Sequence, residues 1–144
     1  MFEKSIEDRI SAWAEHRSNL NTSIDPYTET WEFWKNAPYI PYNKDMDPYN
    51  PKSWPTPWEV IVENKYDDFT KALMIARSLK FTKRFEKSKI EIKTLVNNQN
   101  KCYYNVVCVD ELWAINYNDN GPVELKEIPE SFYLENLIEV EIPR

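Results

Sequence analysis

Few side chains in this sequence could carry covalent or metal chemistry. The chain of 144 residues holds two cysteines, Cys102 and Cys108, and a single histidine, His16. Both cysteines fall in one predicted strand, where a rise of about 3.3 Å per residue separates them by about 20 Å. This separation is too large for a disulfide or for a shared metal ion. With one histidine and two distant thiols, the sequence predicts neither a metal site nor a haem site.

Cofactor loops and paired carboxylates are not indicated either. Gly121 is the only glycine, whereas the loops that cradle phosphate groups need several, so we expect no bound cofactor. Asp67 and Asp68 are neighbours on a predicted helix, where successive side chains point about 100° apart. They therefore do not form an obvious acid–base pair.

One thiol could still act as a nucleophile. Cys102 lies at the start of its strand and could be open to reagents, whereas Cys108 lies among valines and should behave as a small apolar group. A cysteine-dependent hydrolase or transferase that uses Cys102 also needs a base, and His16 is the only imidazole available. The apolar stripe of its helix instead predicts that His16 lies on the solvated outer face.

The overall charge restricts the class of partner. A net charge of -6 and a pI near 4.9 argue against nucleic acid and against anionic membranes as partners. No apolar run approaches the roughly 20 residues that span a bilayer, and the N-terminus lacks the features of a signal peptide. We therefore expect a protein that works in a cytoplasm or in a particle assembled there.

The apolar pattern predicts helices first and strands afterwards. Helices are expected at residues 2–20 and 26–36, then a short helix capped by Thr56 and a long buried helix capped by Asn64. Alternating residues predict strands, the second of them central, and a helical turn near the end; the strands span 89–96, 101–109, 112–117, 123–125 and 137–142, and the turn spans 129–133. This order indicates an α+β fold, with N-terminal helices and a central buried helix packed on an antiparallel sheet of about four to five strands.

The chain is expected to form a single domain, 1–144, of three parts. Residues 1–36 are helical, residues 37–56 form an arm rich in proline and aromatic rings, and residues 57–144 form the core of helix and antiparallel sheet. Large rings favour docking on a surface, so the arm either packs across its own domain or grips another protein. The residues expected to contact such a partner are Trp31, Trp34, Tyr39, Tyr42, Tyr49 and Trp54.

Charge is distributed unevenly along the C-terminal half. Basic residues concentrate between Lys80 and Lys93, whereas acidic residues dominate from 110 to 144. Cations near the end of the buried helix complement its dipole. A surface of two signs also suits assembly with another protein or with further copies of the chain.

Three short motifs resemble the transglutaminase-like branch of the papain-like cysteine enzymes. The run from Lys65 to Leu73 is similar to the motif that opens the family's catalytic helix, with Tyr66 in the position of the nucleophile. The run from Lys101 to Asp110 is similar to the histidine strand, with Cys102 nearest the histidine position. The run from Leu112 to Tyr117 is similar to the strand that ends in the orienting residue, here Asn116 or Tyr117. The resemblance covers about residues 54–118.

The resemblance implies a scaffold that has lost its catalytic residues. A phenol whose pKa is near 10 cannot replace a thiol in acyl transfer at neutral pH, and no histidine follows His16. The implied function is non-enzymatic: protein–protein interaction or structural assembly. The chain, rich in aromatic residues and asparagine, also resembles small proteins of tailed phages, which implies a role in a virion or in takeover of a host protein. A groove at Tyr66 that binds a small ligand is the remaining alternative.

Overall fold

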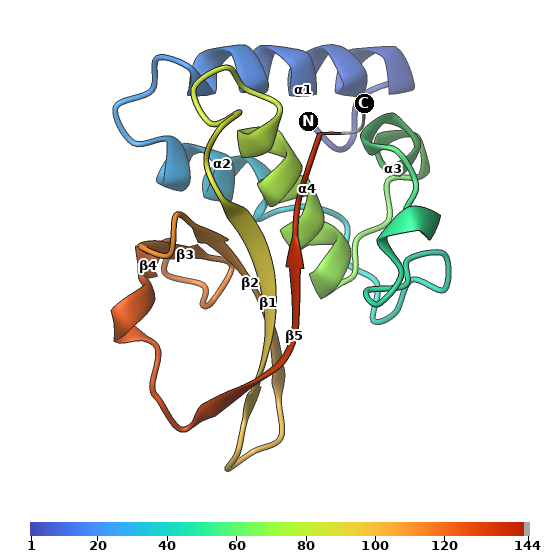
Figure 1. The fold of residues 1–144 in the computed structure, drawn as a ribbon. Coiled ribbons are helices and arrows are strands. Elements are labelled where there is room, and N and C mark those ends of the chain that lie inside the picture. Colours follow the sequence, from blue (N-terminus) through green and yellow to red (C-terminus); the bar gives the residue numbers. More distant parts are fainter. Residues whose placement is uncertain (143–144) are drawn as a thin grey trace.

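The computed structural model describes residues 1–142 and confirms the predicted α+β class. Over these residues, four helices precede a five-stranded antiparallel sheet (Figure 1). The helices are α1 (Ile6–Leu20), α2 (Pro26–Trp34), α3 (Pro57–Glu63) and α4 (Asp68–Lys80). The strands are β1 (Ile90–Asn97), β2 (Tyr103–Val109), β3 (Trp113–Ile115), β4 (Val123–Glu124) and β5 (Phe132–Glu139), and two 3₁₀ turns lie at η1 (Pro51–Ser53) and η2 (Leu125–Glu127).

Side-chain caps define where the two central helices begin. The Thr56 side chain accepts a hydrogen bond from the Glu59 amide while the Glu59 carboxylate accepts one from the Thr56 amide, which is the predicted capping box. The prediction that Asn64 caps the next helix is wrong. Asn64 ends α3 with φ at 58°, a left-handed conformation that asparagine tolerates, and Asp67 caps α4 by accepting from the Thr70 amide.

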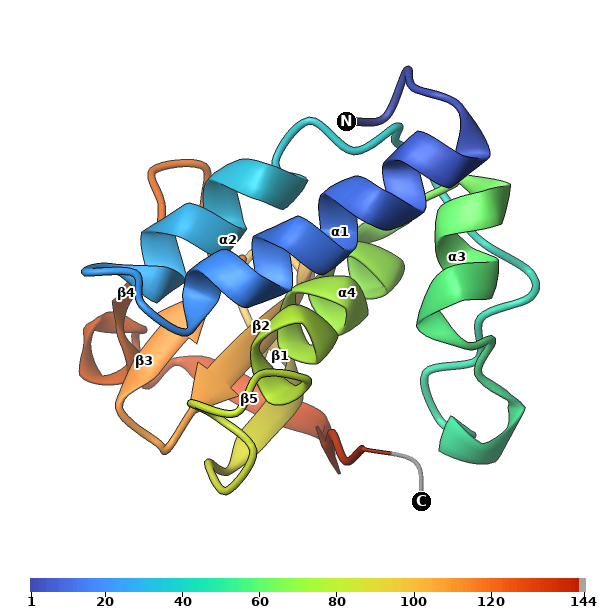
Figure 2. The same cartoon turned by 90° about the horizontal axis from the view of Figure 1, so that it is seen from above.

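Helix α4 packs on one face of the sheet, α2 lies beside it against β3, and α1 lies across both helices (Figures 1 and 2). The strand order is β4-β3-β2-β1-β5, so β2 is central as predicted. Ile92 lies opposite both Val107 of β2 and Ile138 of β5. Ile92 and Val107 belong to the main core with α4, whereas Leu95 and Val106 belong to a smaller core on the opposite face.

The last strand begins five residues earlier than predicted. β5 starts at Phe132, so the helical turn expected at 129–133 does not form. The Phe132 amide donates to the Pro129 carbonyl and closes a single turn there, and the 3₁₀ turn of this region is η2 at Leu125–Glu127. The register between β1 and β5 shifts between Thr94 and Leu95. An irregularity of this kind interrupts the alternation of inward and outward side chains, so the sequence pattern indicates only the second half of the strand.

Three buried polar groups connect α4 with the helices above it. The Ser78 hydroxyl accepts hydrogen bonds from the indole N–H groups of Trp13 and Trp34, both at 2.9 Å, and donates to the Met74 carbonyl at 2.7 Å. Both indoles and Ser78 are fully buried. The prediction that Trp34 contacts a partner is therefore wrong, because its ring fills the core between α2 and α4.

His16 is buried between α1 and α2. Its ring stacks on Phe33 at 4.0 Å between centroids, and its Nε2 lies 2.9 Å from the Thr30 hydroxyl. The prediction of a solvated outer face is wrong because α2 covers the side of α1 that would otherwise be exposed.

The proline-rich arm packs across its own domain, which is one of its two predicted arrangements. Its backbone pairs with Tyr66, two residues before α4: the Tyr66 amide donates to the Pro38 carbonyl and the Ile40 amide donates to the Tyr66 carbonyl, both at 3.0 Å. Further along, Met46 is buried. The Asn136 side chain of β5 donates to the Pro48 carbonyl, so the arm reaches the sheet.

Candidate functional site

A polar cluster joins the start of α4 to the central strands. One carboxylate oxygen of Asp68 accepts hydrogen bonds from the backbone and side-chain amides of Asn105, at 3.3 and 2.9 Å. The other accepts from the Asn116 side-chain amide at 3.2 Å. The same amide group of Asn116 donates to the Asn105 carbonyl at 2.9 Å, and the Asn105 side-chain oxygen accepts from the Thr94 hydroxyl at 2.9 Å. Asp68, Asn105 and Asn116 thus form one network.

Local backbone geometry places these three side chains. Asp67 is the cap of α4, so Asp68 is the first helical residue and its side chain points toward β2. Asn105 lies in β2, in the half of the strand before the fully buried valines. Asn116 directly follows β3 with φ at 71°, a conformation in which asparagine is enriched, and this turn directs its amide back to β2.

A hollow of about 360 Å³ opens beside the network, with tyrosines around it. We call it the tyrosine hollow. The exposed fractions of the side chains are 73% for Tyr42, 63% for Tyr49 and 59% for Tyr103. Tyr42 and Tyr49 come from the arm, and Tyr103 comes from β2. The residues that line the tyrosine hollow are Pro41, Tyr42, Met46, Pro48, Tyr49, Asp67, Asp68, Phe69, Thr94, Tyr103 and Asn105.

The tyrosine hollow is acidic and offers phenol groups. Asp67 and Asp68 are among its lining residues, which include no lysine or arginine. Nearby Glu135 is the largest cause that raises the pKa of Tyr103, followed by its own desolvation and by Tyr133 and Tyr49. A phenol, whose usual pKa is near 10, is protonated at neutral pH, so Tyr103 can donate a hydrogen bond. These groups can bind a partner, but they include no thiol and no imidazole.

The three residues expected from the resemblance are not gathered in one groove. Tyr66 is fully buried, with its ring against Phe2 and Trp34, and burial raises its pKa. Cys102 is exposed in the turn before β2. Asn116 lines a second hollow, beside Asp68, that neither of the other two lines. Asn116 instead makes its hydrogen bonds to Asp68 at the start of α4 and to Asn105 on β2.

The alternatives that depend on Tyr66 and Cys102 lose their geometric basis. A ligand groove at Tyr66 is wrong because the core encloses the ring. The enzyme alternative needs His16 beside Cys102, yet His16 lies between α1 and α2 while Cys102 lies in the β1–β2 turn. Figure 1 shows that turn at the end of the sheet away from α1. The other thiol, Cys108, is fully buried, and burial raises its pKa to about 11.

Apart from the fully buried Trp34, the predicted contact residues separate into two groups. Tyr39, Tyr42 and Tyr49 are exposed. Trp31 and Trp54 are only partly buried but pack on their own core, and the Trp54 indole donates to the Asp47 carbonyl at 2.7 Å.

The sequence did not predict Asp68, Asn105 and Tyr103 as residues of the site. The one signal for them was the polar Asn105 in a strand that is otherwise rich in valine.

Residues 1–142 contain no group of three or more histidine, cysteine, aspartate or glutamate side chains placed to hold a metal ion. Within the same residues, no helix has the length and apolar character to cross a bilayer.

Comparison with known proteins gives no family for this fold and site. No protein-family model, no curated protein and no solved structure matches the chain.

Proposed function

We propose that this protein is a non-enzymatic binding or assembly component and that the tyrosine hollow is its contact surface for another protein. The observation that carries the proposal is the convergence of three exposed tyrosines, from the arm and from β2, on one acidic hollow. Tyrosine is enriched among the residues that dominate binding energy at interfaces. Scattered exposed rings are ordinary on protein surfaces, whereas rings from distant segments around one hollow favour recognition.

The floor of the tyrosine hollow supports this proposal. Asp68 accepts three hydrogen bonds from Asn105 and Asn116, and Asp67 accepts from the Asn43 amide of the arm at 3.1 Å. These bonds tie the arm, α4 and β2 to one another. A surface that is ordered before binding loses less conformational entropy when a partner docks.

The same network supports a role without covalent catalysis. The side chains at the start of α4, on β2 and after β3 are a carboxylate and two amides, which make hydrogen bonds to one another. Acyl transfer requires a nucleophile with an adjacent base, and the tyrosine hollow is lined by neither cysteine nor histidine. The proposed setting is assembly of a tailed-phage particle or takeover of a host protein, and it rests on the resemblance of the sequence to small tailed-phage proteins.

Affinity capture with matched tyrosine variants tests the proposal. The tagged protein, the double variant Tyr49→Ala/Tyr103→Ala and the control Tyr39→Ala are each incubated with a lysate of the native source, and bound proteins are quantified by mass spectrometry. Tyr39 is 71% exposed but does not line the tyrosine hollow. We expect a partner that the wild type and the control recover equally and that the double variant recovers at least tenfold less, since interface tyrosines contribute about 2 kcal/mol or more. Equal recovery by all three folded proteins would contradict the proposal.

A further inference from the structure

Among residues 1–142, strand β5 has no neighbouring strand on its outer edge. It is last in the strand order and pairs only with β1. The Val140 amide donates to the Ile90 carbonyl at 2.8 Å, so the extended pairing continues past the end of β5. Residues two apart in an antiparallel strand bond to the same neighbour. The backbone groups of Ile138 and Val140 therefore face β1, and those of Leu137 and Glu139 face outward.

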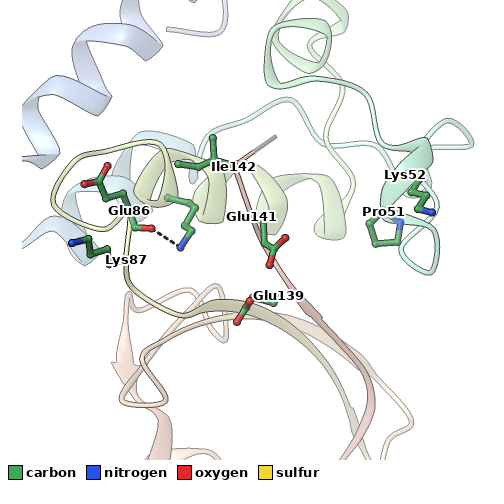
Figure 3. Close-up of a pocket in the computed structure, with 8 residues that line it drawn as sticks. Pro51, Lys52, Glu86, Lys87, Glu139, Glu141 and Ile142 are labelled. Atoms are coloured by element: carbon green, nitrogen blue, oxygen red, sulfur yellow. Dashed lines mark hydrogen bonds between the residues drawn. The ribbon is translucent and has the colours of Figure 1, made fainter. Parts of the chain in front are cut away.

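A large groove runs beside this edge. It has a volume of about 970 Å³ and lies between Pro51 and Lys52 of the arm and Glu86 and Lys87 of the loop after α4 (Figure 3). The loop side is held in place by Lys80, whose ammonium group donates to the carbonyls of Glu86 at 2.9 Å and Ser88 at 2.7 Å. Within residues 1–142, no hydrogen bond from the arm or from this loop reaches the backbone of β5. An exposed edge of this kind is a template for another strand.

The charges along the outer edge of β5 indicate which side chains a partner strand would carry. Glu139 and Glu141 line the groove, and Leu137, which is 43% exposed, precedes them on the same side of the strand by the alternation of side chains. Figure 3 shows Lys52 and Lys87 directed away from the strand, while the two carboxylates lie next to it. Side chains of an added strand stand about 5 Å from those they oppose, so basic residues fit opposite the glutamates.

A second copy of β5 fits this edge poorly. Antiparallel self-pairing centred on Leu137 would place Glu135 of one copy opposite Glu139 of the other, twice in each dimer. Like charges directly opposite each other destabilise a strand pair. The acidic edge thus disfavours self-association and favours a basic segment.

We propose that the outer edge of β5 binds an extended segment of a partner protein by strand addition, with lysine or arginine at alternate positions opposite Glu139 and Glu141. Backbone hydrogen bonds provide affinity in this mode, and alternate side chains provide specificity. The inference stands apart from the tyrosine hollow, because it depends on β5 and the groove alone.

A designed peptide pair tests the proposal by NMR titration. The probe is acetyl-Lys-Thr-Lys-Thr-Val-Thr-Lys-Thr-Lys-amide, whose sequence reads the same in both directions, and the comparison peptide has glutamate in place of every lysine. We expect saturable binding of the lysine peptide with the largest amide shifts at Leu137 and Glu139, and binding of the glutamate peptide at least tenfold weaker. The variant Glu139→Lys/Glu141→Lys should reverse this preference.

Two further variants separate strand addition from general attraction between opposite charges. Glu7→Lys/Glu15→Lys changes the net charge of the protein equally, but on the exposed side of α1, and should bind the lysine peptide nearly as well as the wild type does. Leu137→Pro removes an outward N–H without removing a bond to β1, and should weaken binding of the lysine peptide at least fivefold. Equal losses in the two charge-reversal variants, or no saturable binding of either peptide at millimolar concentration, would overturn the proposal.

Discussion

Replacing Ser78 with alanine is expected to lower the free energy of unfolding by about 3 kcal/mol. The Ser78 hydroxyl accepts from the indole groups of Trp13 and Trp34, and all three residues are fully buried. Alanine leaves both N–H groups without an acceptor, and each buried unsatisfied donor costs about 1–3 kcal/mol. The higher helix propensity of alanine returns only about 0.5 kcal/mol. Urea denaturation measures the change as a shift in midpoint at constant slope.

Two comparisons isolate the hydroxyl. Ser18→Ala removes an exposed serine from the last turn of α1 and should change stability by less than about 0.5 kcal/mol. Trp13→Phe removes one of the two donors, so it should cost less in the Ser78→Ala background than in the wild type. Additive costs in this double-mutant cycle, or a Ser78→Ala protein as stable as the wild type, would mean that the shared acceptor contributes nothing.

Lowering the pH from 7 to 4 is expected to remove about 3 kcal/mol of stability through His16 alone. Burial, and then the positive charge of Arg17, lower the pKa of His16 from 6.5 to about 4. The unfolded chain therefore takes up a proton as the pH falls below about 6.5, whereas the native protein does so only near pH 4. The contribution of His16 to the free energy of unfolding is fully present above pH 6.5, falls between pH 6.5 and pH 4, and levels off below pH 4. Each pKa unit corresponds to about 1.36 kcal/mol.

The variant His16→Gln separates this effect from the titration of carboxylates. Both proteins are unfolded with urea at intervals between pH 4 and pH 8. The difference in unfolding free energy between wild type and variant should shrink by about 3 kcal/mol toward pH 4. NMR titration of the imidazole gives its pKa directly. A native pKa near 6.5, or two stability curves that run parallel, would show that His16 is not buried against Phe33.

The elements of the fold could be predicted from the sequence because each has a local signal. Helix α4 repeats apolar residues at helical spacing, and β2 contains a run of valines that indicates a central strand. Thr56 and Glu59 indicate the start of α3 through their spacing alone. β5 carries a weaker signal, since an edge strand with a register shift exposes side chains on both faces.

The site could be predicted only in part because it depends on how the elements meet. Asn116 was expected to matter, but Asp68 and Asn105 become its partners only through the position of α4 on β2. The same reason explains His16 and Trp34, whose burial is caused by the packing of α2. No local pattern in the sequence specifies these contacts between distant segments.

The measurement that tests the central claim most directly is hydrogen–deuterium exchange of the protein, free and bound to the captured partner. If the tyrosine hollow is the contact surface, binding should slow exchange in the segments 42–49 and 103–105, which contain Tyr42, Tyr49 and Tyr103. Protection confined to α1 and α3, with both segments exchanging as fast as in the free protein, would contradict it.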